Sequence, residues 1–137
     1  MSSTHHWFKA KLREMPLDDC LEVLGNNQVG RIAFNDPSGP VVLPVNYSVT
    51  NGAILIATAT GSSLHSYVPG SLVAFEVDDV DEFNEDGASV LVRGRAAIVP
   101  TEGFSDDERP YTWPEGPREV LLHIVPTQIT GRRLFPA

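Results

Sequence analysis

Hydrophobic positions change their spacing once, early in the chain. Apolar side chains from Leu17 to Leu24 recur at intervals of three and four residues, which places them on one face of a helix. Pro16 suits the first turn of such a helix, and Gly25 suits its end. The pattern therefore predicts a short helix over residues 16–26, with Cys20 buried as a structural thiol.

After this helix, apolar residues alternate with polar ones, which is the period of a β-strand. Asn51-Gly52 is a strong signal for a hairpin turn of type I′. Pro44 indicates a sheet edge or a bulge, and Gly94 indicates a bend. Short antiparallel connections predict a mainly β fold, a closed or nearly closed barrel with one or two short helices. Six strands are predicted, over residues 28–34, 41–50, 53–59, 72–77, 87–99 and 119–129.

The segments outside these strands carry further predictions. Residues 1–15 are expected to form a flexible arm, which leaves residues 16–137 as a single domain. Residues 61–68 predict one or two helical turns. The acidic segment 78–86 is expected to be a solvated loop, and the proline-rich segment 100–118 an irregular excursion with one helical turn.

Composition narrows the class of protein. The 137 residues suffice for one domain with its own core. The net charge is −8, from 18 acids and 10 bases, and such a surface repels a nucleic-acid backbone. No apolar stretch approaches the ~20 residues that span a membrane, and no secretory leader is recognisable. A single cysteine favours a reducing compartment, so we expect a cytoplasmic protein that binds neither nucleic acid nor membrane.

Charge is distributed unevenly along the chain. No Lys or Arg lies between Arg31 and Arg93, whereas seven acids crowd into residues 76–86. An anionic ligand bound by the middle of the chain must therefore take its positive charge from residues far away in sequence. His65 and His123 are widely separated and have no nearby cysteines, so we expect no metal site.

One segment, Thr58–His65, gathers hydroxyl side chains where a strand ends and a short helix begins. Free N–H groups at a helix start attract anions, so the segment is a candidate phosphate cradle. The alternative is a capped helix, with Ser62 as the N-cap and nothing bound. Four cations far away in sequence are candidates to complete the cradle: Arg93, Arg95, Arg132 and Arg133.

The order and spacing of several weak motifs, taken together, identify a family. The motifs follow one another in this order: the helix Leu17–Leu24 running into Val29-Gly30-Arg31-Ile32-Ala33, then Pro44-Val45-Asn46-Tyr47, Ile54-Leu55-Ile56-Ala57-Thr58, Gly61-Ser62-Ser63-Leu64, Val73-Ala74-Phe75-Glu76-Val77-Asp78, Gly87–Gly94, Trp113 and Ile129–Arg133. With them, from about Leu12 to Leu134, the chain resembles the FMN-binding split-barrel family, the pyridoxamine 5′-phosphate oxidase-like proteins. The resemblance implies a six-stranded antiparallel split β-barrel.

The resemblance also implies a homodimer with FMN in a cleft between the subunits. Pro44, Val45, Asn46 and Tyr47 would lie along the flavin ring. Trp113 and the terminal arginines, including Arg132, would close the cleft from the other subunit. The phosphate would be held by the segment that contains Thr58, Thr60, Gly61, Ser62, Ser63 and Leu64.

Three positions depart from the family pattern. The family commonly has an arginine and a lysine where this chain has Ala57 and Ser63, and an aromatic residue where it has Ala88. Charge-assisted contacts to phosphate are roughly twice as strong as neutral ones, so the absence of the arginine and the lysine weakens the FMN assignment. Three functions stay open: an FMN-dependent oxidoreductase of unknown substrate, an F420-dependent reductase of the same fold, and a non-catalytic flavin- or ligand-binding dimer. Oxidation of pyridoxamine 5′-phosphate itself is disfavoured, because that substrate adds a second phosphate.

Overall fold

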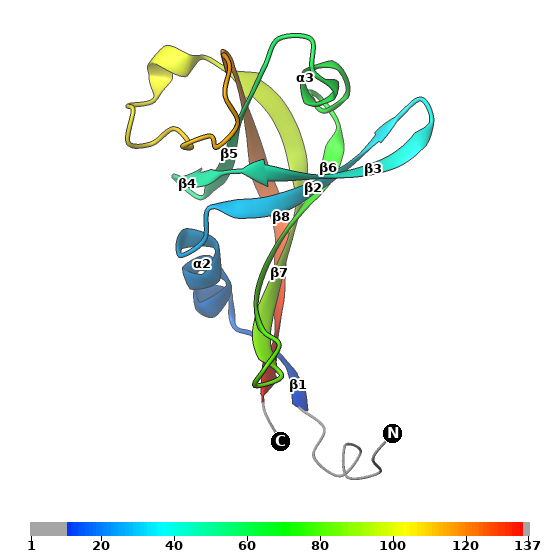
Figure 1. The fold of residues 1–137 in the computed structure, drawn as a ribbon, viewed down its shortest axis with the longest axis vertical. Coiled ribbons are helices and arrows are strands. Elements are labelled where there is room, and N and C mark those ends of the chain that lie inside the picture. Colours follow the sequence, from blue (N-terminus) through cyan, green and yellow to red (C-terminus); the bar gives the residue numbers. More distant parts are fainter. Residues whose placement is uncertain (1–10, 136–137) are drawn as a thin grey trace.

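One antiparallel sheet forms the body of the protein, and it curls because its two ends are joined by a single residue. The computed structural model describes residues 11–135. The sheet has eight strands in the order β3-β2-β6-β7-β8-β5-β4, with β1 paired to β8 (Figure 1). The strands are β1 (Lys11–Glu14), β2 (Val29–Asp36), β3 (Gly39–Asn46), β4 (Ser48–Thr50), β5 (Ala53–Thr58), β6 (Leu72–Asp81), β7 (Asp86–Val99) and β8 (Val120–Phe135).

Tyr47 is the residue that links the two ends of the sheet. It separates β3 from β4, which stand at opposite ends of the strand order. Its N–H donates to the carbonyl oxygen of Gln28 at 3.0 Å, and its hydroxyl donates to the carbonyl oxygen of Leu24 at 2.6 Å. Its ring meets Phe75 edge-on, with centroids 4.8 Å apart. These contacts hold the curled sheet in the shape of a split barrel.

The inner face of the sheet carries the core, and α2 (Leu17–Gly25) packs against it. Cys20 is 1% exposed, as the sequence predicted, and burial raises the pKa of its thiol. A Cβ atom added at Gly131 would lie 2.5 Å from Sγ of Cys20. The helix therefore approaches β8 as closely as a glycine permits.

The outer face of the sheet is covered in part by residues 100–118, here called the 100–118 loop, which includes η1 (Thr101–Gly103). Ser48 and Thr50 donate side-chain hydrogen bonds to the carbonyl oxygen of Glu108 in this loop. Leu55 and Leu121 lie on the outer face of the sheet, where they pair with His123 and Ala57. They are nevertheless only 0% and 1% exposed. The loop therefore buries a second, smaller apolar layer outside the barrel.

The sequence correctly predicted the mainly β antiparallel fold and several local features. Asn51 and Gly52 have φ angles of 52° and 78°, as a type I′ turn requires. The register of β7 against β8 shifts between Arg93 and Gly94, which is the predicted bend. Pro44 lies on β3, an edge strand of the described sheet.

Four predicted boundaries were wrong. The acidic segment 78–86 is a hairpin rather than a loop, because β6 and β7 pair without interruption from Leu72↔Arg95 to Asp81↔Asp86. Both faces of this hairpin are exposed, so its residues show no alternation. The predicted strand 41–50 is divided at Tyr47, and the last strand continues to Phe135.

The N-terminal arm is the fourth correction, because part of the predicted flexible segment 1–15 is a strand. Residues Lys11–Glu14 form β1 and pair with the end of β8. The rest of the arm, residues 1–10, lies outside the described residues. With β1 and the division at Tyr47, the sheet has eight strands instead of six. Within residues 11–135, neither helix has the length and apolar character needed to cross a membrane.

Candidate functional site

A pocket opens where the end of β3, the end of β5 and the 100–118 loop meet. Its volume is about 230 Å³. We call it the Asn46 pocket. It is lined by Pro44, Val45, Asn46, Ala57, Thr58, Ala59, Ser62, Leu64, Thr112, Pro114 and Arg118.

Asn46 connects the strand end to the loop that covers it. Its side-chain oxygen accepts a hydrogen bond from the backbone N–H of Trp113 at 2.8 Å. The Trp113 side chain is 64% exposed and is not among the residues that line the pocket. The loop is therefore attached through its backbone, and the indole is left available to solvent or to a neighbouring molecule.

The hydroxyl-rich segment after β5 forms the opposite wall, and most of its polar groups bond to one another. Ser62 Oγ lies 2.7 Å from Oγ1 of Thr58 and accepts the N–H of His65 at 3.1 Å. The N–H of Gly61 donates to Nδ1 of His65 at 3.0 Å. Ser62 thus caps α3 (Ser63–Tyr67), as the capped-helix alternative predicted. These internal bonds occupy N–H groups that a phosphate cradle would need.

Arg118 is the one cation among the described residues that line the pocket, and it was not among the residues predicted from the sequence. A signal for it existed in the pairing of β5 with β8. Thr58 pairs with Val120, so the residues just before 120 lie beside the residues just after 58. Thr60 donates to a carboxylate oxygen of Glu119 at 2.7 Å across this junction, and that bond holds the pKa of Glu119 below its usual value.

The arginines that sequence reasoning named as candidate cations lie elsewhere. Arg93 donates to the Gln128 side chain, and Arg95 donates to the carbonyl oxygen of Gly70, both at 2.7 Å. Arg132 lines a separate cavity of about 640 Å³ with Glu76 and Arg93 on the outer face of β7 and β8. Within one chain, these arginines do not reach the Asn46 pocket.

Six of the twelve predicted cofactor-binding residues line the Asn46 pocket: Pro44, Val45, Asn46, Thr58, Ser62 and Leu64. Tyr47 is buried behind it, with its hydroxyl bonded to Leu24. Thr60, Gly61 and Ser63 belong to the hydroxyl-rich segment after β5, but they are exposed and do not line the pocket. Trp113 lies nearby on the loop, and Arg132 is in the separate cavity.

A second cavity adjoins the Asn46 pocket under the same loop. It has a volume of about 380 Å³ and shares Ala57, Thr112 and Arg118 with the Asn46 pocket. We call it the Tyr111 pocket. Its other lining residues are Asp106, Arg109, Pro110 and Tyr111.

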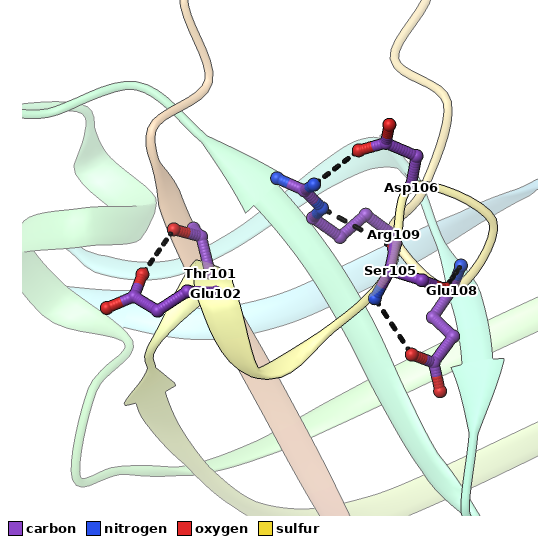
Figure 2. Close-up of polar contacts among 6 residues, drawn as sticks. All are labelled: Thr101, Glu102, Ser105, Asp106, Glu108 and Arg109. Atoms are coloured by element: carbon purple, nitrogen blue, oxygen red, sulfur yellow. Dashed lines mark hydrogen bonds and ion pairs between the residues drawn. The ribbon is translucent and has the colours of Figure 1, made fainter.

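Arg109 is held inside the loop that forms the Tyr111 pocket. Figure 2 shows its guanidinium paired with the carboxylate of Asp106. Its Nε also donates to the carbonyl oxygen of Ser105 at 3.5 Å. The N–H groups of Glu108 and Arg109 both donate to the carbonyl oxygen of Ser105 at 3.1 Å, which closes the predicted helical turn. The N–H of Ser105 also donates to the Glu108 carboxylate at 2.9 Å (Figure 2). Arg109 is therefore neutralised locally, unlike Arg118.

Two larger cavities share no lining residue with the Asn46 pocket or the Tyr111 pocket. One is the outer-face cavity that contains Arg132. The other, of about 560 Å³, lies between α2 and β1 and is lined by Arg13 and Arg133 together with Glu14, Asp19, Glu22 and Asp79. Four carboxylates against two arginines disfavour an anionic ligand there. Residues 11–135 contain no group of His, Cys, Asp and Glu side chains arranged to hold a metal ion.

Comparison with known proteins decides the family. The sequence profile of pyridoxamine 5′-phosphate oxidase matches residues 16–133. The chain belongs to the pyridoxamine 5′-phosphate oxidase-like family. This agrees with the split-barrel fold and with the resemblance found in the sequence.

Several known proteins resemble the chain over most of its length. An uncharacterized Mycobacterium tuberculosis protein, Rv0080, is 28% identical and aligns with 88% of this chain and 84% of its own. The FAD binding protein from Mycobacterium smegmatis is 31% identical, with a TM-score of 0.71 over 90% of this chain and 98% of that one. A Corynebacterium glutamicum protein assigned as a pyridoxamine 5′-phosphate oxidase is 28% identical, with a TM-score of 0.75 over 92% and 95%.

Proposed function

We propose that this protein binds a flavin, FMN, in the Asn46 pocket and serves as a flavin-dependent oxidoreductase. One observation carries the proposal: the pocket unites an apolar strand end, hydroxyl groups and an arginine in one concave site. Pro44, Val45 and Leu64 offer apolar surface to a planar ring. Thr58, Ser62 and Arg118 offer polar contacts to a phosphate. The FAD-binding M. smegmatis relative supports a flavin as the ligand.

The lining of the pocket indicates what the flavin and the protein would each contribute to the reaction. A bound flavin supplies hydride or electron transfer, so the protein needs no nucleophile of its own. Backbone groups of Val45 and Asn46 would orient the polar edge of the ring, and Leu64 would exclude water from it. The polar side chains on the β5 side of the pocket would hold the phosphate end.

A homodimer would complete the site. A volume of about 230 Å³ is below the ~300–1,000 Å³ of pockets that enclose a cofactor-sized ligand, so one chain covers only part of a flavin. The outer face of the sheet carries exposed apolar side chains at Leu72 and Val125, which are 62% and 50% exposed. Both flank Arg95 in one row across β6, β7 and β8. We place this dimer in the cytoplasm, where a lone thiol such as Cys20 stays reduced.

FAD is a second candidate ligand, favoured by the Tyr111 pocket. The two pockets share Arg118, so a group attached to the flavin phosphate would extend toward Tyr111 and Arg109. The deazaflavin F420 is less well supported. Its long anionic tail needs several cations along an extended groove, whereas Arg109 already pairs with Asp106.

The absorbance spectrum of the freshly purified protein tests the proposal directly, since a bound flavin absorbs visible light. The apoprotein is then titrated with FMN, FAD and F420 in parallel. We expect the tightest binding for FMN or FAD and reduction of the bound flavin by a nicotinamide donor. Binding without turnover would favour the non-catalytic alternative, and a colourless protein that binds no added flavin would overturn the proposal.

Arg109→Ala separates the two flavins, because Arg109 lines only the Tyr111 pocket. If FAD is the natural ligand, this variant should weaken FAD binding and leave FMN binding unchanged. Equal affinities of the variant and the wild type for FAD would leave FMN as the ligand.

A further inference from the structure

We infer that Arg118, on the 100–118 loop, is the residue that binds the phosphate of the flavin. The inference rests on the proposed function and names the cation that its site requires. Arg118 lies at the boundary of the two pockets and lines both of them. No other Lys or Arg among residues 11–135 lines the Asn46 pocket.

The Arg118 guanidinium is available for a ligand. Its one hydrogen bond within residues 11–135 goes to the carbonyl oxygen of its own neighbour, Pro117, at 3.0 Å. No carboxylate of the described residues lies within ion-pair distance of it. The nearest acid in sequence, Glu119, accepts its hydrogen bond from Thr60, and the charge of Arg118 contributes least to the lowered pKa of this carboxyl. The other arginine beneath this loop, Arg109, is paired with Asp106.

Strand pairing places Arg118 on the hydroxyl-rich side of the Asn46 pocket, where the phosphate would bind. The register that pairs Thr58 with Val120 places Arg118 beside the residues that follow β5. Ala57 lines both pockets, and its methyl group leaves space that a longer side chain would fill. The 100–118 loop thus supplies from outside the sheet a positive charge that β5 lacks.

The hydroxyl-rich segment beside Arg118 offers mainly neutral groups that already bond to one another. Ser62 bonds to Thr58 and to the N–H of His65, and the N–H of Gly61 bonds to the same histidine. A phosphate bound there without Arg118 would lose the charge-assisted contacts, which are roughly twice as strong as neutral ones. The arginine is therefore expected to account for much of the discrimination between flavins with and without a phosphate.

The test compares FMN with riboflavin, which is the same ring and ribityl chain without the phosphate. Dissociation constants are measured by flavin fluorescence for the wild type, Arg118→Ala, Arg118→Lys and Arg109→Ala. Arg118→Ala should weaken FMN binding about 10- to 100-fold and leave riboflavin binding unchanged. Arg118→Lys keeps the charge and should recover part of the loss. Arg109→Ala removes the same charge from the same loop and should leave FMN binding unchanged.

Three outcomes are decisive. Equal weakening of FMN and riboflavin by Arg118→Ala would mean that the arginine only supports the loop. No weakening of either ligand would mean that the phosphate binds elsewhere, and both results overturn the inference while flavin binding stands. A wild-type protein that binds neither ligand would overturn the proposed function itself. Far-ultraviolet circular dichroism of each variant verifies that the fold is retained.

Discussion

The backbone N–H of Trp113 donates to the side-chain oxygen of Asn46 at 2.8 Å, and this bond joins residues 67 positions apart in the chain. It fastens the 100–118 loop to the end of β3 at the rim of the Asn46 pocket. Because the same loop carries Arg118, the bond connects the strand expected beside the flavin ring to the cation expected at its phosphate.

Asn46→Ala should loosen this loop. The lost hydrogen bond contributes about 1 kcal/mol, so local opening around Trp113 should become about fivefold more frequent. Hydrogen exchange measured by mass spectrometry would reveal this as faster exchange in residues 111–118. Asn46→Asp is the matched control, since it keeps an acceptor oxygen and should keep the exchange slow. Unchanged exchange in the alanine variant would mean that other contacts hold the loop.

The buried hydroxyl of Tyr47 makes a second prediction. Tyr47→Phe leaves the carbonyl oxygen of Leu24 without its partner, which costs about 1–3 kcal/mol for a buried polar group. Urea denaturation at pH 7 and constant protein concentration measures this loss. Tyr111→Phe is the control, because Tyr111 is 77% exposed and should not change the free energy of unfolding.

Alkaline pH should narrow the difference between the wild type and Tyr47→Phe. Burial raises the pKa of Tyr47 to about 12, whereas an unfolded tyrosine ionises near ~10. The neutral phenol is thus favoured in the folded state, and its contribution is fully present below pH ~10. It is lost as the pH rises from ~10 toward 12. Denaturation curves at pH 9, 10 and 11 should show the wild type losing stability faster than the phenylalanine variant.

The close approach of β7 to β8 at Gly94 leads to a prediction about stability. A Cβ atom at this position would lie 2.3 Å from the carbonyl oxygen of Val125, so the bend in β7 would have to open. Gly94→Ala should reduce the free energy of unfolding by about 1–3 kcal/mol, as overpacking does. Gly25→Ala is the control, because nothing lies within 4 Å of the added Cβ. A Gly94 variant as stable as the wild type would show that the two strands separate there without strain.

Sequence predicted most of the elements because local chemistry decides them. The Asn51-Gly52 turn, the Ser62 cap and the burial of Cys20 each depend on neighbouring residues, and all three were correctly anticipated. The hairpin over residues 78–86 was missed because its stability comes from backbone pairing with no buried side chains. Apolar and polar residues alternate along a strand only when one of its faces is buried, so a strand with both faces exposed shows no such pattern.

The site was predictable on its strand side and not on its loop side. Asn46, Thr58 and Ser62 belong to the segments on which the resemblance to the family rests, and they line one pocket. Arg118 follows from a pairing between strands that are far apart in sequence, and no local pattern predicts which strands will pair. The separation of Arg132 from the pocket has the same origin, since it depends on the register of β8.

The outer face of the sheet makes the last prediction. Leu72, Arg95 and Val125 lie in one row across three strands, and both apolar members are at least half exposed. If this face joins two subunits, Leu72→Asp would place a charge in an apolar contact, where burying it unpaired is unfavourable. The variant should be a monomer by light scattering and should bind flavin more weakly, because each site would lose its second half.

Phe83→Asp is the control for this dimer prediction, since Phe83 is 95% exposed in the turn of the β6–β7 hairpin, away from that row. It adds the same charge and removes a larger apolar surface, so a general effect of charge on association would appear in both variants. A dimer lost in Leu72→Asp alone would assign the interface to the outer face. A wild type that is monomeric at micromolar concentration would contradict the dimer, and the Asn46 pocket would then have to bind flavin within one chain.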